Sequence, residues 1–154
     1  MRAFGRRFVE RLRETTGVGG DPSRFAASWA VGVGIGLSPL LGAHTLLALA
    51  VALLFRLNKV DVLLGTLVSN PWTLSVYFPV ATALGSLLTG TPLAVPALPP
   101  PAELADPALW RQQAHVLRPL LVSWLVGGGV LATLGAGLTF VAVRRLARRL
   151  SSPR

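Results

Sequence analysis

The chain has 154 residues, of which 52% are apolar and 14% are charged, and its net charge is +9. Soluble domains carry about 25% charged residues, so the composition argues against an ordinary water-soluble fold. Most of the positive charge lies in the two tails, residues 1–13 and 144–154, without a basic and aromatic platform, which argues against nucleic-acid binding. The absence of cysteine excludes disulfides, thiolate metal ligands and thiol catalysis.

Three long segments contain no Asp, Glu, Lys or Arg: residues 25–55, 62–95 and 119–143. A membrane-crossing helix needs about 20 apolar residues, and each segment is longer than that. The apolar core of a signal peptide has only about 7–15 residues, so we expect the first segment to be retained. The three segments predict an all-α integral membrane protein whose membrane domain covers residues 21–145.

The N-terminal segment, residues 1–20, is basic. Within it Phe4, Phe8 and Leu12 recur at every fourth position, as they do in an amphipathic helix that lies at a membrane interface. A partly ordered basic tail is an equally good interpretation, and the sequence does not separate the two.

Three dipeptides predict helix starts: Asp21-Pro22, Ser38-Pro39 and Asn70-Pro71. In each, a short polar side chain suited to an N-cap precedes a proline, which is favoured at the first helical position. We therefore predict helices over residues 22–37, 39–55, 60–69 and 71–88. At about 1.5 Å per residue, none of them comfortably crosses about 30 Å of hydrocarbon. This predicts a helical hairpin, 22–55, and a broken or re-entrant arrangement that continues through 60–88.

The C-terminal half begins with a loop, because residues 89–107 hold six of the twelve prolines. A helix is predicted to start after Asp106, and on it Arg111, His115 and Arg118 share one face, where we expect them to contact lipid headgroups. Residues 119–143 predict a C-terminal transmembrane helix, which a basic tail, 146–154, follows.

Positive charge also predicts the orientation. Both tails are basic, and so is the turn at residues 56–59, while Arg24 marks the other end of the hairpin. Basic segments stay in the cytoplasm, so both termini are predicted to be cytoplasmic and the number of full crossings to be even. A re-entrant hairpin with two crossings and a four-crossing arrangement both satisfy this condition.

Two sets of glycines are spaced for helix packing. Gly32 and Gly36 form a GxxxG pattern, and Gly129, Thr133 and Gly137 form a second stripe of small residues. Such spacing lets helices approach closely in lipid, within one chain or in a homo-oligomer. A dinucleotide site is not indicated, because the glycines follow no strand and have a different spacing.

A candidate polar site follows from the helix breaks. Helix N-termini bind anions, and some transporters direct broken helices at an anionic substrate. We predict a shared site for a phosphate headgroup or similar anion, lined by Ser38, His44, Asn58, Ser69 and Asn70. The alternative is that these residues only satisfy the backbone where helices break. Separately, Asp61 is predicted to cap the helix that follows Lys59. No enzyme is predicted, because a Ser38–His44–Asp61 triad has no nucleophile-elbow pattern, and no metal or cofactor is indicated.

The chain resembles the bacterial membrane family catalogued as domain of unknown function 2062. The resemblance covers roughly residues 20–145 and rests on the motifs Pro39-x-x-Gly42-x-His44-Thr45, Arg56-x-Asn58 and Asn70-Pro71-x-Thr73. It implies a small protein of the bacterial inner membrane. Some relatives are joined to glycosyltransferase-like domains, which implies envelope polysaccharide or lipid-linked sugar chemistry nearby.

Two functions are compatible with these patterns. The first is a non-enzymatic protein that binds an anionic lipid headgroup or small anion at the helix breaks. An extended form of this hypothesis adds translocation of the bound anion across the membrane. The second is a membrane scaffold that docks an envelope-synthesis enzyme through its basic tails. The expected partners are membrane lipids in the first case and such an enzyme in the second.

Overall fold

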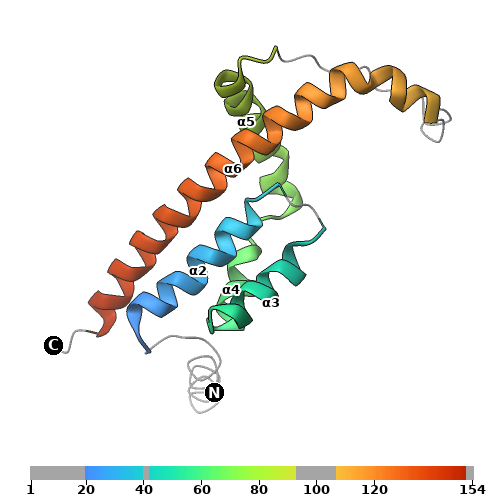
Figure 1. Ribbon diagram of the computed structural model, residues 1–154. Helices are drawn as coiled ribbons and strands as arrows, with labels where there is room; N and C mark the ends of the chain where they lie inside the picture. The colour runs from blue at the N-terminus through green and yellow to red at the C-terminus, as the bar shows by residue number, and fades with distance from the viewer. Residues whose placement is uncertain (1–19, 40–41, 93–106, 152–154) are drawn as a thin grey trace. The chain divides into compact units, whose positions relative to one another are not determined.

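The computed structural model describes residues 20–39, 42–92 and 107–151, and this part of the chain is helical and contains no strand. The all-α prediction is therefore confirmed. In chain order the helices are α2 (Pro22–Gly36), α3 (His44–Leu54), α4 (Lys59–Thr66), α5 (Pro71–Thr89) and α6 (Pro107–Ser151) (Figure 1). The predicted amphipathic helix near the N-terminus and most of the predicted proline-rich loop lie outside the described residues.

Contacts group the chain into two compact units. Unit 1 comprises residues 1–71 and 131–154, and unit 2 comprises residues 72–130. Helices α2, α3 and α4 therefore belong to unit 1 together with the C-terminal part of α6. Nearly all of α5 and the N-terminal part of α6 belong to unit 2.

Two of the three proline-marked helix starts in the first half of the chain are confirmed. Asp21 is the N-cap of α2, where its Oδ1 accepts a hydrogen bond from the Ser23 N–H at 2.9 Å and Pro22 takes the first helical position. Helix α5 begins at Pro71, directly after Asn70. Both starts follow the local rule that a short polar residue and a proline together begin a helix.

The predicted start at Ser38-Pro39 is wrong, because α3 begins only at His44. Ser38 instead closes the preceding helix: its hydroxyl donates to the Ile35 carbonyl at 2.7 Å and its N–H donates to the same oxygen at 3.1 Å. A serine that satisfies the last carbonyls of one helix does not cap the next. Gly42, with a φ of +86°, then leads into α3 in a conformation that favours glycine.

Helix α6 is longer than the predicted final span. It begins at Pro107 as predicted, and its 45 residues correspond to about 68 Å. Pro119 lies inside it, so the predicted headgroup-contacting face and the predicted span of 119–143 belong to one continuous helix.

Small residues bring α2 and α4 together in unit 1. A Cβ atom on Gly32 would overlap the Val62 carbonyl oxygen and lie 2.8 Å from the Gly65 Cα, and one on Gly36 would lie 3.0 Å from the Thr66 carbonyl oxygen. Such close backbone approach is typical of helix pairs with glycine at the interface. The order of the contacts shows that α2 and α4 run in the same direction.

A similar contact joins α5 and α6 within unit 2. A Cβ atom on Gly85 would overlap the Ser123 carbonyl oxygen, and one on Gly127 would overlap the Ala81 carbonyl oxygen. Each helix thus contributes two small residues four positions apart, and the order of the contacts shows that the two helices are antiparallel here.

The second predicted glycine stripe, Gly129 and Gly137, is not at a helix contact among the described residues. A Cβ atom on Gly129 or Gly137 would meet no described atom within 4 Å, whereas Gly127 and Gly135 lie against neighbouring helices of their own units. Residues two positions apart on a helix point in widely different directions, so the sequence identified the helix correctly but not its packed face.

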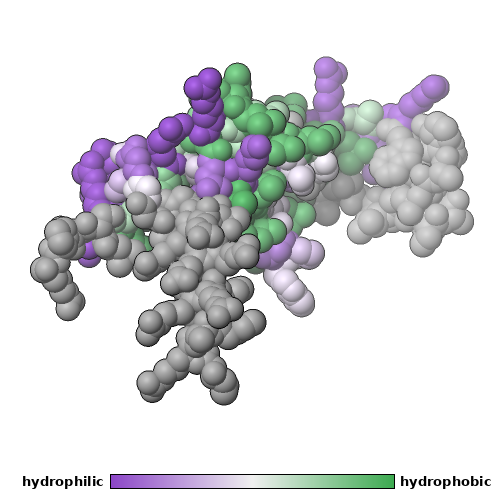
Figure 2. Space-filling view, turned by 90° about the horizontal axis from the view of Figure 1, so that it is seen from below, coloured by the Kyte–Doolittle hydropathy of each residue, from purple (hydrophilic) through white to green (hydrophobic). Residues whose placement is uncertain are grey.

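Small apolar residues are buried and many large apolar residues are exposed, which is the opposite of what a soluble protein shows. Six of the nine buried hydrophobic residues that the structure describes are alanines. By contrast, Leu54, Trp72 and Leu87 are 77%, 86% and 82% exposed, and Figure 2 shows apolar side chains reaching the surface beside hydrophilic ones. Exposed apolar surface on this scale marks contact with another apolar phase or partner. Among the described residues, Pro71–Thr89 and Arg111–Arg149 are long and apolar enough to cross a membrane.

Candidate functional site

The structure brings together only part of the predicted polar site. Ser38 and His44 are neighbours, because the His44 Nε2 lies 3.4 Å from the Ser38 carbonyl oxygen, which can only accept. Ser69 and Asn70 follow α4, whose C-terminal end lies beside that of α2, since a Cβ on Gly36 would lie 2.9 Å from the Val68 Cγ1. These four predicted residues therefore share one end of unit 1.

Asn58 lies at the opposite end. Helix α4, with 8 residues and a length of about 12 Å, separates it from Ser69. The Asn58 N–H donates instead to the Ser28 hydroxyl at 3.2 Å, near the start of α2. The five predicted residues thus do not form one site.

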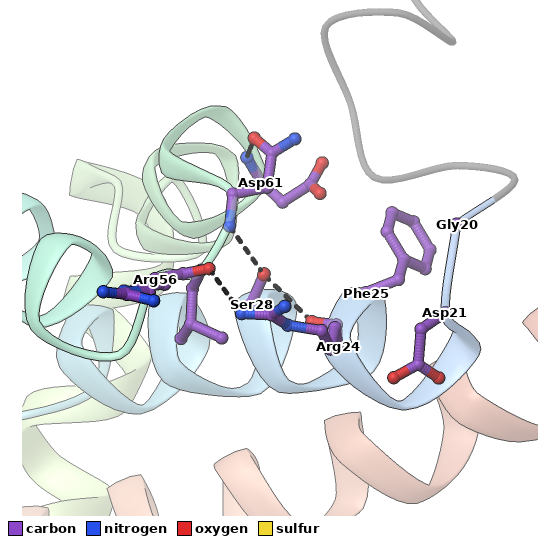
Figure 3. Close-up of a pocket in the computed structure, with 9 residues that line it drawn as sticks. Gly20, Asp21, Arg24, Phe25, Ser28, Arg56 and Asp61 are labelled. Atoms are coloured by element: carbon purple, nitrogen blue, oxygen red, sulfur yellow. Dashed lines mark hydrogen bonds between the residues drawn. The ribbon is translucent and has the colours of Figure 1, made fainter.

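A polar pocket of about 310 Å³ lies at this opposite end. Its wall is formed by the start of α2 and by the turn between α3 and α4, as Figure 3 shows. The residues that line it are Gly20, Asp21, Arg24, Phe25, Ser28, Arg56, Leu57, Asn58 and Asp61. Asn58 is the one predicted site residue among them, so the pocket is a candidate site that the sequence reasoning had largely missed.

Arg56 lines the pocket from the turn that ends α3. Its N–H donates to the Leu53 carbonyl at 3.2 Å, and the Leu57 N–H donates to the Ala52 carbonyl at 2.8 Å, which is the Schellman pattern of a helix C-terminus. Arg56 occupies the position in that motif where the chain is left-handed, with a φ of +52°. Glycine is usual there, and a residue with a Cβ is strained by roughly 1–2 kcal/mol.

Arg24 ties the start of α2 to this turn. Its Nη2 donates to the Arg56 carbonyl oxygen at 2.9 Å, so the two ends of the predicted hairpin meet as expected. The Ser28 hydroxyl donates to the Arg24 carbonyl at 3.0 Å and accepts from Asn58. These bonds hold two guanidinium-bearing residues of distant sequence position at one pocket.

The pocket also receives the N-terminus of α4. Asn58 is its N-cap, with Oδ1 accepting from the N–H groups of Val60 at 2.9 Å and Asp61 at 3.3 Å. Asp61 is therefore the third residue of the helix rather than its cap, so the prediction that it caps α4 is wrong. Its side chain is fully buried, in the first turn, where a negative charge is favoured by the helix dipole.

Two helix N-termini make the pocket a candidate site for an anion. The positive ends of α2 and α4 both lie there, and helix N-termini favour negative ligands. Arg24 and Arg56 both line the pocket, and Asp21 and Asp61 formally balance their two positive charges. The planar fork of a guanidinium group matches carboxylate and phosphate oxygens. Among the described residues no cluster of His, Asp and Glu is suited to hold a metal ion.

More positive charge gathers at the same end of unit 1. Helix α6 runs antiparallel to α2, since Gly135 approaches Leu37 and Ala136 approaches Gly34. The last turns of α6 therefore lie beside the start of α2 (Figure 1). Those turns carry Arg144, Arg145, Arg148 and Arg149.

The predicted headgroup-contacting residues lie in unit 2. Arg111, His115 and Arg118 are all exposed on α6, and the His115 Nδ1 lies 2.8 Å from the Gln112 carbonyl oxygen. None of the three lines the pocket, whose arginines were assigned from the sequence only as markers of the hairpin ends. The signal that could have identified the pocket was that both ends of the hairpin were already predicted to meet on one side.

Comparison with known proteins agrees with the resemblance seen in the motifs. No curated protein and no solved structure matches the chain. One family model matches residues 5–154, and its description is "Uncharacterized protein conserved in bacteria (DUF2062)". Since that match covers nearly the whole chain, the protein belongs to the DUF2062 family.

Proposed function

We propose that this protein resides in the bacterial inner membrane and binds the anionic headgroup of a lipid, or a small anion, in the pocket of Arg24 and Arg56. One observation carries the proposal: an arginine occupies the strained left-handed position after α3, where glycine is usual, and lines a pocket with a second arginine. Backbone strain of this kind is retained where it serves a function.

The distribution of apolar residues supports the membrane location. Large side chains face outward while alanine and glycine fill the helix contacts, as in helix packing within lipid. Helices α5 and α6 are long enough to cross. Helices α2 and α3 have 15 and 11 residues, fewer than the about 20 that a span needs, which favours a re-entrant hairpin.

The basic end of unit 1 supports the orientation. Arg24, Arg56 and Lys59 lie at the same end as the arginines of the last turns of α6. Positive residues remain in the cytoplasm and attract anionic headgroups. With two crossings, through α5 and α6, both termini are cytoplasmic and the pocket opens at the cytoplasmic leaflet.

The test is anion binding by the purified protein in detergent. Phosphatidylglycerol, phosphatidylcholine and inorganic phosphate are titrated and the bound fraction is measured by native mass spectrometry for the lipids and by calorimetry for phosphate. Arg24→Gln and Arg56→Gln should each weaken phosphatidylglycerol binding about tenfold or more, since a hydrogen bond to a charged group contributes about 1.5–3 kcal/mol. Lys59→Gln is the matched control, because it removes the same charge from an exposed position outside the pocket.

Two results would overturn the proposal: wild-type protein that does not distinguish phosphatidylglycerol from phosphatidylcholine, or arginine variants that bind like Lys59→Gln. Translocation is an additional step beyond binding. It is measured separately, as the movement of a labelled anionic lipid between leaflets of proteoliposomes.

A second candidate function is a scaffold for an envelope-synthesis enzyme. The observation that favours it is the exposed group of Arg145, Arg148 and Arg149 on the last turns of α6. Replacing all three by glutamine should then abolish function in cells and leave phosphatidylglycerol binding by the purified protein intact. The reverse result, loss of function only with the Arg24 and Arg56 variants, favours the binding protein.

A further inference from the structure

Asp61 is a buried acidic residue of the polar pocket. Its side chain is 0% exposed, whereas Asp21, the other acidic residue that the structure describes, is exposed. Asp61 precedes Gly65 by four positions, so the two share one face of α4, and Gly65 lies against Gly32 of α2. Figure 3 shows the Asp61 side chain reaching from α4 over the first turns of α2. The carboxyl group is therefore part of the pocket wall and is shielded from water.

The formal charges of the pocket cancel and leave no positive surplus for an anion. The charged residues that line it are Arg24, Arg56, Asp21 and Asp61. A bound anion therefore lies near a carboxylate, and two like charges at one site oppose each other's charged forms. Water reaches Asp21 and weakens this repulsion there, whereas the repulsion is strong at Asp61, because charges interact more strongly in a medium of low dielectric constant. The anion and a proton on Asp61 thus stabilise each other.

The other charged groups at this end of unit 1 are cations. They are Arg24, Arg56 and Lys59 together with the arginines on the last turns of α6. Lysine and arginine already carry their proton at neutral pH, so none of them can take up another. His44, the titratable residue of α3, begins that helix, and the pocket lies at the other end of it. Among the described residues, Asp61 is therefore the group that accepts a proton when an anion binds.

We propose that anion binding in the pocket is coupled to protonation of Asp61. The anion enters together with a proton, which the Asp61 carboxylate takes from water, and it leaves when that proton is lost. A singly charged headgroup and a proton together add no net charge to the pocket. This inference rests on the proposed function and adds its regulation by pH: because coupling between two ligands is reciprocal, acid tightens anion binding.

The first test is the pH dependence of binding by the purified protein in detergent. Sulfate and phosphatidylglycerol are the probes, because both stay ionised over the range tested, from about pH 5 to pH 8. Uptake of a proton predicts that the dissociation constant of each probe rises by up to about tenfold for each unit of increasing pH. Calorimetry in buffers with different heats of ionisation measures the same uptake independently, and it should show a proton gained by the protein when the anion binds.

Substitutions at the two aspartates assign the proton. Asp61→Asn replaces the carboxyl group by an amide of similar size, so it should abolish the pH dependence and bind both probes about tenfold more tightly than wild type at the alkaline end of the range. Asp61→Glu restores a carboxyl group and should restore the pH dependence. Asp21→Asn is the matched control, because it removes the same charge from an exposed position of the pocket while asparagine still caps α2. It should keep the wild-type pH dependence.

The outcomes separate the coupling from the binding itself. Wild-type binding that is independent of pH and takes up no proton overturns the coupling and leaves the proposed function standing. The same conclusion follows if Asp61→Asn keeps the pH dependence or if Asp21→Asn loses it. If neither Asp61 variant folds, the calorimetry on wild-type and Asp21→Asn protein still decides the question. Wild-type protein that binds neither probe, or Arg24→Gln protein that binds both normally, overturns the proposed function and the coupling with it.

Discussion

Arg56→Gly should make the protein more stable and a poorer anion binder. Arg56 has a φ of +52° in the Schellman turn after α3. This conformation costs a residue with a Cβ roughly 1–2 kcal/mol, whereas glycine adopts it freely but loses about 0.5–1 kcal/mol more chain entropy on folding. The net expectation is a gain of about 0.5–1 kcal/mol in the free energy of unfolding, with anion binding weakened about tenfold.

The assay is thermal unfolding of the detergent-purified protein, followed by tryptophan fluorescence, together with the phosphatidylglycerol titration. Phe55→Gly is the stability control, because Phe55 has a φ of −93°, where glycine relieves no strain. It adds the entropic cost and removes a partly buried side chain, so it should destabilise. Arg56→Lys keeps the charge and the strain, so its unfolding midpoint should stay at the wild-type value. If Arg56→Gly destabilises the protein as much as Phe55→Gly does, the strain argument is refuted, and unchanged lipid binding refutes the role of the guanidinium group.

Three further predictions concern packing, capping and orientation. Gly32→Leu should destabilise the fold by several kcal/mol or prevent folding, because even a Cβ there overlaps the backbone of α4. Gly137→Leu, at a position with no described atom near its Cβ, should leave the unfolding midpoint nearly unchanged, and equal effects would contradict the packing assignment. Asn58→Ala should cost about 1 kcal/mol of stability through the lost N-cap, whereas Asn58→Asp should retain it. Because the chain has no cysteine, Arg145→Cys provides a single label: a membrane-impermeant maleimide should react with it in inside-out vesicles, and reaction only in right-side-out vesicles would reverse the orientation.

Local sequence signals predicted the helices well wherever one residue and its immediate neighbours decide the outcome. Asp21-Pro22 and Asn70-Pro71 begin helices because capping geometry depends on only a few consecutive residues. Ser38-Pro39 has the same local pattern but ends a helix instead. The Ser38 hydroxyl can accept from the first N–H groups of a helix that follows it, or donate to the last carbonyls of the helix that precedes it. In the structure it donates to the Ile35 carbonyl at the end of α2.

The candidate site was less accessible to sequence reasoning. Helix breaks located the polar residues, but Asn58 precedes α4 and Ser69 follows it, so the length of α4 places them at opposite ends of unit 1. Arg56 looked like an ordinary basic flank, because the sequence does not reveal a positive φ at a residue other than glycine. The spacing of Gly129 and Gly137 was equally suggestive, yet the packed glycines are Gly127 and Gly135.

By itself the sequence determined that the chain is helical, apolar and basic at both ends. These properties follow from composition and periodicity, which do not depend on contacts between distant residues. The sequence also determined that Arg24 and Arg56 would lie near each other, since both flank one hairpin. Only the tertiary structure decided which helix faces touch and that the pocket forms at the start of α2. Those features depend on the direction and rotation of each helix relative to its neighbours, which contacts between distant residues set.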